Sequence, residues 1–281
     1  MKDVAAQRDE RGITLDRVGI RGLHLPVTIR QQAGGDARVV GHFDATVELP
    51  HYERGTHMSR FVEILGTWSK SRVSQAEMHE ALLQLREAFD APAAYLSMSF
   101  KYFLDKLTPV SKLPCQLDYD CRFDAKMVAA DPEGRRDGEF AFAVEVHVPV
   151  LTVCPCSLEI ACEGAHSQRA TITVRAGTKV GVIVWLEDLI PLIERQGSYE
   201  VFPVLKREDE KHVVERSFEN PKFVEDVVRD TVLALQSLPG VEWYEVVCDS
   251  QESIHNHNAY AYARGGGPKG SPGGGGAWSL R

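Results

Sequence analysis

The stretch Ala129-Ala-Asp-Pro-Glu-Gly-Arg-Arg-Asp-Gly138 divides this chain of 281 residues into two halves. It is polar, it contains proline and glycine, and it lies near the middle of the chain, where such residues interrupt helices and strands. The hydrophobic patterns on its two sides follow the same order. We therefore predict two modules, one over residues 1–130 and the other over residues 138–263.

The half before this stretch has the periodicities of strand, strand, helix, helix, strand and strand. Apolar residues that alternate with other residues predict strands over 23–29, 43–49, 96–102 and 117–123. Apolar residues spaced three and four apart predict helices over 61–68 and 78–89. Ser74 and Glu77 form a capping-box pattern in front of the second helix.

The half after the stretch repeats this order. Alternation predicts strands over 140–148, 172–174, 241–249 and 257–263, and helical spacing predicts helices over 186–193 and 224–235. Asn220 is the predicted N-cap of the second helix, with Pro221 in its first turn. The predicted fold class is α+β, with two tandem ββααββ modules, each an antiparallel sheet with its helices on one face. The open edges of such sheets favour joining to further copies in a closed barrel.

The charge balance argues against some classes of partner. The chain has 32 Lys and Arg against 40 Asp and Glu, and its net charge of −8 disfavours a general nucleic-acid or membrane-surface binder. An anionic ligand must then meet a local cluster of cations. We find no signal peptide at the N-terminus and no segment with the roughly 18 apolar residues of a membrane span, so the predicted location is the cytoplasm. Residues 264–281 are rich in glycine and are predicted to form a flexible tail.

The segment Thr152-Val-Cys-Pro-Cys-Ser157 places two thiols directly after a predicted buried strand. His166 follows it, and Glu252-Ser-Ile-His-Asn-His257 lies on a polar segment further along. Cys, His and Glu are ligands of Zn²⁺, and a catalytic zinc site takes about three of them with a position left for water. The alternative is that the cysteines pack in the core while the histidines lie on surface loops.

Two other segments are candidates for binding an anion. His57, Ser59 and Arg60 lie at the start of a predicted helix, where free N–H groups favour phosphate, although an ordinary N-cap explains them as well. Lys206 and Arg207 lie between the two predicted helices of the second half. They offer cations to a polyphosphate, or they form a solvated charged segment.

Seven blocks of sequence stand out when they are taken in order. They are Asp9-x-Arg-Gly-Ile-Thr-Leu-Asp-Arg-Val-Gly-Ile20, Gly-Thr-His-Met-Ser-Arg-Phe at 55–61, Cys-Pro-Cys-Ser at 154–157, Gly-Ala-His-Ser-Gln-Arg at 164–169, Leu-Lys-Arg-x-Asp-Glu-Lys at 205–211, Glu-Asn-Pro-Lys-Phe-Val-Glu-Asp at 219–226 and Glu-Ser-Ile-His-Asn-His at 252–257. Taken together, they resemble the GTP cyclohydrolase type IB (FolE2) family. Together these blocks extend over nearly everything from about residue 4 to residue 263.

This resemblance implies a fold, an assembly and a reaction. The fold is the tunnelling fold (T-fold), and the assembly is a homotetramer with active sites at subunit interfaces. GTP and water are converted to 7,8-dihydroneopterin triphosphate and formate, the first step of folate and pterin biosynthesis. The resemblance also implies a divalent metal, and the donor types suit Zn²⁺, Mn²⁺ or Fe²⁺ without selecting among them.

Residue by residue, the resemblance implies a metal site, a catalytic set and a substrate site. The implied metal ligands are Cys156, His166, Glu252 and His255. Cys154 is the second thiol and is either catalytic or the alternative ligand, so the catalytic candidates are Cys154, Cys156, His166 and His255. Glu225 is implied to bind the guanine edge. The remaining substrate-binding candidates are His57, Ser59, Arg60, Lys206 and Arg207, with Arg169 as a further cation.

Three other functions stay open on the sequence alone. An archaeal-type relative would convert GTP to the 2′,3′-cyclic phosphate of dihydroneopterin. A non-catalytic T-fold protein would bind a purine or pterin without releasing formate. A structural zinc protein would unfold when its metal is removed.

Overall fold

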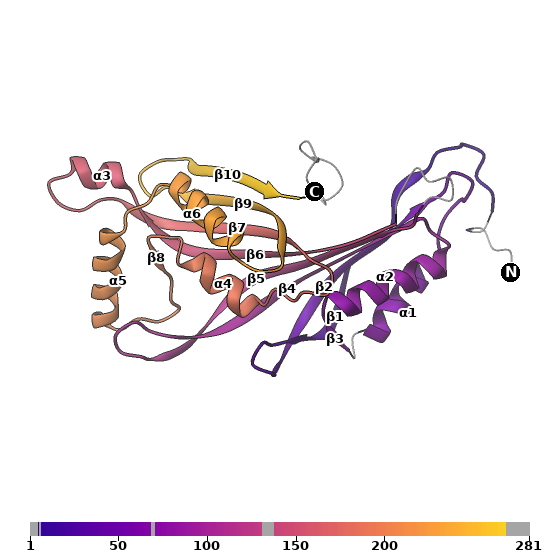
Figure 1. The fold of residues 1–281 in the computed structure, drawn as a ribbon, viewed down its shortest axis with the longest axis horizontal. Coiled ribbons are helices and arrows are strands. Elements are labelled where there is room, and N and C mark those ends of the chain that lie inside the picture. The colour runs from indigo at the N-terminus through magenta and orange to yellow at the C-terminus, as the bar shows by residue number, and fades with distance from the viewer. Residues whose placement is uncertain (1–4, 6, 69–70, 131–137, 268–281) are drawn as a thin grey trace.

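The structure is a computed structural model that describes residues 5, 7–68, 71–130 and 138–267 (Figure 1). The first module contains β1 (Leu15–Arg30), β2 (Asp36–Leu49), α1 (Met58–Trp68), β3 (Arg72–Val73), α2 (Gln75–Phe89), β4 (Ala93–Leu107) and β5 (Pro114–Val128). The second module contains β6 (Glu139–Val153), α3 (Pro155–Ile160), β7 (Ser167–Thr178), α4 (Leu186–Glu194), β8 (Tyr199–Glu200), α5 (Arg207–Glu219), α6 (Val224–Gln236), β9 (Val241–Gln251) and β10 (Asn258–Gly266).

All the long strands join into a single antiparallel sheet. Its order is β10-β9-β7-β6-β5-β4-β2-β1-β3, and β8 pairs separately with β6. Each module contributes four long strands in equivalent order, and the modules meet where β5 pairs with β6. The predicted α+β architecture of two tandem ββααββ modules is therefore confirmed. The short strands β3 and β8 and the helices α3 and α5 are additions that hydrophobic periodicity did not predict.

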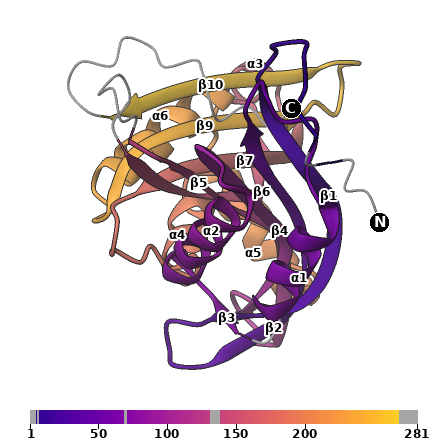
Figure 2. The same cartoon turned by 90° about the vertical axis from the view of Figure 1, so that its right-hand side faces the viewer.

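The core lies between the sheet and its helices. Along β5, Tyr119, Cys121 and Phe123 alternate with polar residues and belong to one cluster with buried side chains of α1, α2, α4 and α6. Alternating side chains point to opposite faces of a strand, so these helices all cover the same face of the sheet. Figure 2 shows α2 and α4 together on that side of the curved sheet.

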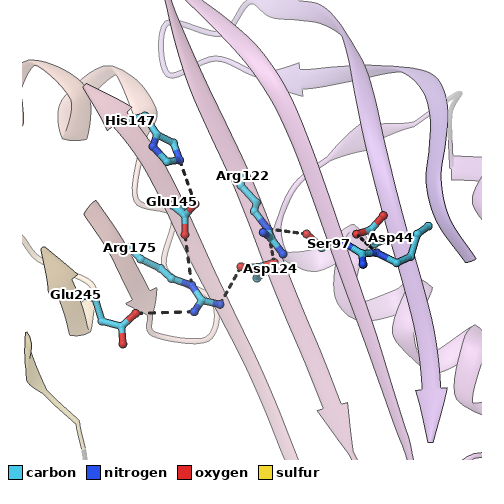
Figure 3. Close-up of polar contacts among 9 residues, drawn as sticks. Asp44, Ser97, Arg122, Asp124, Glu145, His147, Arg175 and Glu245 are labelled. Atoms are coloured by element: carbon cyan, nitrogen blue, oxygen red, sulfur yellow. Dashed lines mark hydrogen bonds and ion pairs between the residues drawn. The ribbon is translucent and has the colours of Figure 1, made fainter. Parts of the chain in front are cut away.

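The opposite face of the sheet carries charged side chains instead of helices. Asp124 is only 3% exposed, and its carboxylate accepts hydrogen bonds from Arg122 Nε at 2.9 Å and from Arg175 at 2.8 Å (Figure 3). Arg122 also donates to Ser97 Oγ at 2.8 Å, and Arg175 lies beside Glu145. Because a buried carboxylate needs partners, this network fixes β4, β5 and β7 to one another across the junction of the modules.

The predicted cap of the last helix is wrong. The helix α6 begins at Val224 with Phe223 at its N-cap, and Asn220 instead ends α5. The Asn220 amide donates to the carbonyls of Gly197 and Ser198 at 3.2 Å, while the Asp226 carboxylate accepts from the Phe223 N–H. Asn220 therefore holds a loop, and an acid inside the helix supplies the capping acceptor.

Two further predictions concern the end of the chain and the membrane. The strand β10 reaches Gly266, so it includes the first three residues of the predicted tail, which starts at 264. Residues 268–281 of that tail, like residues 131–137 of the dividing stretch, lie outside the described residues. Within the described ranges, none of the helices combines the length and the apolar character needed to cross a bilayer.

Candidate active site

The predicted site residues gather at two opposite ends of the sheet. Strand β6 has 15 residues, which at about 3.3 Å per residue separates its ends by about 50 Å. Cys154 follows Val153 at one end, where β7 begins, and we call this the cysteine end. At the other end Glu139 pairs with Val128, and the register continues through β4 to the end of β2. The segment with His57 follows β2 there, and we call this the His57 end.

At the cysteine end, backbone hydrogen bonds place His166 beside Cys154. The ladder between β6 and β7 continues past Val153 and Ser167, so that the Cys154 N–H donates to the His166 carbonyl at 3.2 Å. Cys154 is also the N-cap of α3, and its Sγ accepts from the Ser157 N–H at 3.4 Å. Cys156 lies in the first turn of α3 and is exposed. The structure therefore ties Cys154, and not Cys156, directly to His166.

The His166 ring is held by polar neighbours that fix its orientation. Gln168 donates through Nε2 to Thr152 Oγ1 at 3.3 Å, which leaves its Oε1 facing His166 Nδ1 at 2.8 Å. In a neutral ring Nδ1 then carries the proton, and Nε2 keeps its lone pair. Glu252 lies on the same side, with Oε2 at 3.6 Å from Nδ1, and both side chains are 11% exposed. The His166 Nε2 is thus the ring atom prepared to bind a metal.

The rest of the 252–257 segment completes this cluster. Ser250 is buried and donates to Glu252 Oε1 at 3.1 Å, so that the carboxylate is held by β9. The His255 ring lies perpendicular to that of His166, with centroids 6.3 Å apart, and stacks on His257 at 5.2 Å. Both His255 and His257 are exposed.

These side chains test the predicted metal site. Three of the four predicted ligands, His166, Glu252 and His255, lie together, with Cys154 adjoining them and Cys156 exposed on α3. Thiol, imidazole and carboxylate are the donors that Zn²⁺ and similar ions take, so the chemistry of the set fits a divalent metal. Within the described part of the chain, however, no three such side chains form a ready ligand group.

Other predicted substrate residues lie at the same end. The Lys222 N–H donates to the Val153 carbonyl at 3.0 Å, which brings the loop between α5 and α6 against the end of β6. Glu225 lies in the first turn of α6, and its charge influences Cys248 on the neighbouring strand β9. Burial, together with the charges of Asp249 and Glu225, raises the pKa of the Cys248 thiol to about 12. Arg169, on β7, faces solvent opposite Leu151.

Lys206 and Arg207 stand at the start of α5, where Lys206 is the N-cap residue. Both are exposed. Sequence reasoning missed Asp209 within the same block, because a buried acid among charged neighbours gives no signal in hydrophobic periodicity. It missed Gln168 for the same reason, because its role depends on a neighbouring strand.

At the His57 end the chain forms a pocket of about 670 Å³. His57 and Arg60 line it with Tyr52 and Glu53, while Ser59 is exposed and does not line it. Arg60 donates to the Ala88 carbonyl at 2.9 Å. Burial and the charge of Asp90 raise the pKa of Glu53 in this pocket. The structure therefore separates His57, Ser59 and Arg60 from all other predicted site residues; Figure 1 shows α1 and α3 at opposite ends.

Solved structures with this fold include uricases. The structure of uricase from Arthrobacter globiformis superposes with a TM-score of 0.54 and 7% identity, covering 96% of this chain and 97% of that one. A hyper-thermostable mutant of AgUricase gives a TM-score of 0.55 at 7% identity, with 92% and 94% covered. At such low identity the likeness concerns the fold alone, and it confirms the predicted tunnelling fold.

Comparison of sequences gives the family. The profile described as type I GTP cyclohydrolase folE2 matches residues 1–261. GTP cyclohydrolase FolE2 of Syntrophotalea carbinolica is 41% identical over 93% of this chain and 94% of its own length. Those of Kosmotoga olearia and Maridesulfovibrio salexigens are 42% and 43% identical, each over 93% of this chain and over 97% and 98% of their own lengths. The chain belongs to the type I GTP cyclohydrolase FolE2 family.

Proposed function

We propose that this chain is a GTP cyclohydrolase I that hydrolyses GTP at C8 of guanine and releases 7,8-dihydroneopterin triphosphate and formate. Family membership supports the reaction. The observation that carries its location is the contact of His166 with Glu252 beside Cys154. Opening the imidazole ring of guanine needs an activated water and groups that transfer protons, and this cluster offers both kinds of residue.

A divalent metal belongs to this proposal. The ligand set predicted from sequence is Cys156, His166, Glu252 and His255. We propose Cys154, whose backbone N–H donates to the His166 carbonyl, in place of the exposed Cys156. His166 would bind through Nε2, because Gln168 occupies Nδ1. A metal held there would lower the pKa of a bound water toward neutrality, which is the chemistry that yields a nucleophile. Whether the metal is Zn²⁺, Mn²⁺ or Fe²⁺ is decided by the experiment below.

The neighbouring groups handle protons. Glu252 is held by Ser250 through Oε1, which leaves Oε2 directed at the His166 ring. In this position the carboxylate faces Nδ1, so it would have to turn toward the Nε2 side of the ring to serve as the predicted fourth ligand. His255 and His257 are exposed beside this cluster and are placed to pass protons during the later opening of the ribose.

Substrate binding requires two chains in this proposal. Glu225 binds the guanine edge, and Lys206, Arg207 and Arg169 meet the triphosphate from the same chain. His57, Ser59 and Arg60 lie about 50 Å away along β6, farther than a nucleotide can reach, by the same strand rise. A second copy must therefore bring its His57 end to the cysteine end of the first. A homotetramer with interface active sites satisfies this requirement. The sheet edges allow it, with β10 at one edge and β1, covered only in part by the short β3, at the other.

The test starts from metal-stripped protein supplied with Zn²⁺, Mn²⁺, Fe²⁺ or no metal. Formate is measured, together with the fluorescent neopterin formed after oxidation and dephosphorylation. Turnover with one metal, with a triphosphate product, supports the proposal and identifies the ion. A 2′,3′-cyclic phosphate product would indicate the archaeal-type reaction instead. GTP binding without formate under every condition would indicate a binding protein, and unfolding on metal removal a structural zinc site.

A further inference from the structure

Asp209 is the most completely bonded buried acid at the cysteine end. It lies in the first turn of α5 and is 0% exposed. Its Oδ1 accepts from the N–H groups of Val110 and Ser111, both at 2.9 Å. Its Oδ2 accepts from Ser111 Oγ at 2.6 Å and from the Lys206 N–H at 3.0 Å. All four donors are neutral groups, and together they occupy both oxygens of the carboxylate. Asp209 therefore joins the segment at 110–111 to the start of α5.

The segment that Asp209 binds is the turn between β4 and β5. Thr108 Oγ1 lies 2.8 Å from Ser111 Oγ and accepts from the Leu113 N–H at 2.9 Å, while the Thr108 N–H donates to the Leu113 carbonyl at 3.1 Å. These bonds make the turn stiff. Asp209 therefore connects a rigid turn of the first module to a helix of the second.

The rest of α5 buries few apolar side chains, although the His212 ring contacts Tyr199 further along the helix. Apart from Asp209, its buried residues are Val213 and Ser217, and Val214 is exposed. A helix is normally held by an apolar face, and this one buries a single large apolar side chain. Burial disfavours the ionised form of Asp209, but the hydrogen bonds from Ser111, Lys206 and Val110 outweigh it and hold its pKa below the usual range. The ionised carboxylate is thus the main contact that fixes the start of α5.

We propose that Asp209 is a positioning residue for substrate binding, which holds Lys206 and Arg207 where they meet the triphosphate of GTP. Lys206 is the N-cap residue, and its backbone N–H donates a hydrogen bond to Asp209 Oδ2. Arg207 is the next residue. Asp209 itself has no acceptor left for substrate. This inference rests on the proposed role of the two cations. Replacing Lys206 or Arg207 by alanine tests their phosphate-binding role separately from the positioning role of Asp209.

The experiment compares variants of the metal-loaded enzyme for KM and kcat with GTP and for inhibition by guanosine, which lacks the phosphates. Asp209→Asn keeps the shape but cannot accept from both Lys206 and Ser111. We expect KM for GTP to rise about tenfold, with kcat changed less than about threefold and guanosine inhibition unchanged. Glu208→Gln is the matched control, because it removes an equal charge from the same turn at an exposed position, and it should retain the wild-type values.

A double-mutant cycle with Arg207→Ala separates positioning from general stability. If Asp209 acts through Arg207, the double variant resembles the more affected single variant. Full additivity, or an equal loss of guanosine inhibition, would overturn the proposal and make Asp209 merely structural. Wild-type KM in both Lys206→Ala and Arg207→Ala would also overturn it, by removing the phosphate role on which it rests. Should Asp209→Asn fail to fold, Ser111→Ala removes one of the four bonds and is expected to raise the same KM by a smaller factor.

Discussion

The two thiols of the Cys-Pro-Cys segment have different surroundings, and only one of them adjoins His166. From the sequence, both were within reach of one site. The structure distinguishes them through the ladder between β6 and β7, whose last bond joins Cys154 to His166. Spacing along a chain cannot reveal such a bond, because it depends on which strand is the neighbour.

We predict that Cys154→Ala loses both bound metal and turnover, whereas Cys156→Ala keeps most of its metal. Removing one ligand from a site of three or four typically costs far more affinity than removing a residue outside it. The measurement is the metal content per chain after dialysis, with near-ultraviolet circular dichroism to check folding. Equal metal loss in both variants would show that both thiols bind the ion, and loss only in Cys156→Ala would restore the ligand set predicted from sequence.

Glu145 on the charged face predicts a loss of stability in acid. Burial opposes its ionisation, but His147, Arg175 and Arg122 outweigh burial, so its pKa lies below the ordinary value of 4.5. The native state then favours the ionised form. Its contribution to stability is complete above pH 4.5 and is lost as the pH falls through the lowered pKa.

The corresponding measurement is the urea midpoint between about pH 6 and pH 3. Wild-type protein should lose stability over the acidic part of this range, and Glu145→Gln should show a smaller change. Glu139→Gln serves as the control, because Glu139 pairs with Lys126 at a half-exposed position. An unchanged slope in Glu145→Gln would assign the acid sensitivity to other carboxyls.

At the scale of elements, the backbone of strand β7 packs closely against an indole ring of strand β9. Gly177 lies opposite Trp243, and a Cβ added to Gly177 would come within 1.9 Å of Trp243 Nε1. The indole must therefore move if any other residue stands there. We predict that Gly177→Ala destabilises the fold by about 1–3 kcal/mol, as overpacking commonly does.

A denaturant titration of Gly177→Ala measures this effect. Gly66→Ala is the matched control, because Gly66 lies inside α1 and a Cβ there meets nothing within 4 Å. Alanine favours a helix interior, so this second change should be neutral or stabilising. A neutral Gly177→Ala would mean that Trp243 has room to shift.

Periodicity predicted the elements that bury an apolar face and failed for those that do not. Alternation along β5 and the helical stripe of α2 were sufficient, because each side chain's burial follows from its own position. The sequence of α5 is too polar to give such a signal, and the start of this helix is held by the hydrogen bonds of Asp209. Asn220 was predicted as a cap because it precedes Pro221, but its amide binds two carbonyls of a distant loop.

At the scale of the whole molecule, the proposed division of each active site between two chains predicts complementation. His166→Ala damages the cysteine end and Arg60→Ala the His57 end, so each variant alone should be inactive. In a mixed assembly, a site that takes its cysteine end from one variant and its His57 end from the other is intact. With equal amounts and random assembly, about a quarter of the sites should recover.

The two variants are produced together, and formate release is compared with that of wild-type protein. The control is a mixture of His166→Ala with Glu225→Ala, since both changes affect the cysteine end and no intact site can form. No recovery in the first mixture would place the whole site within one chain, against the separation along β6.

The length of β6 also has a consequence for how activity depends on the amount of protein. On the proposed division of the site, a solitary chain with half a site at each end of a strand of 15 residues would be inert. Once subunits begin to dissociate, the rate falls with about the square of the enzyme concentration, since two chains must meet to make one site. Halving the supply of the protein would then lower product formation by more than half, so its expression level acts as a steep control on flux.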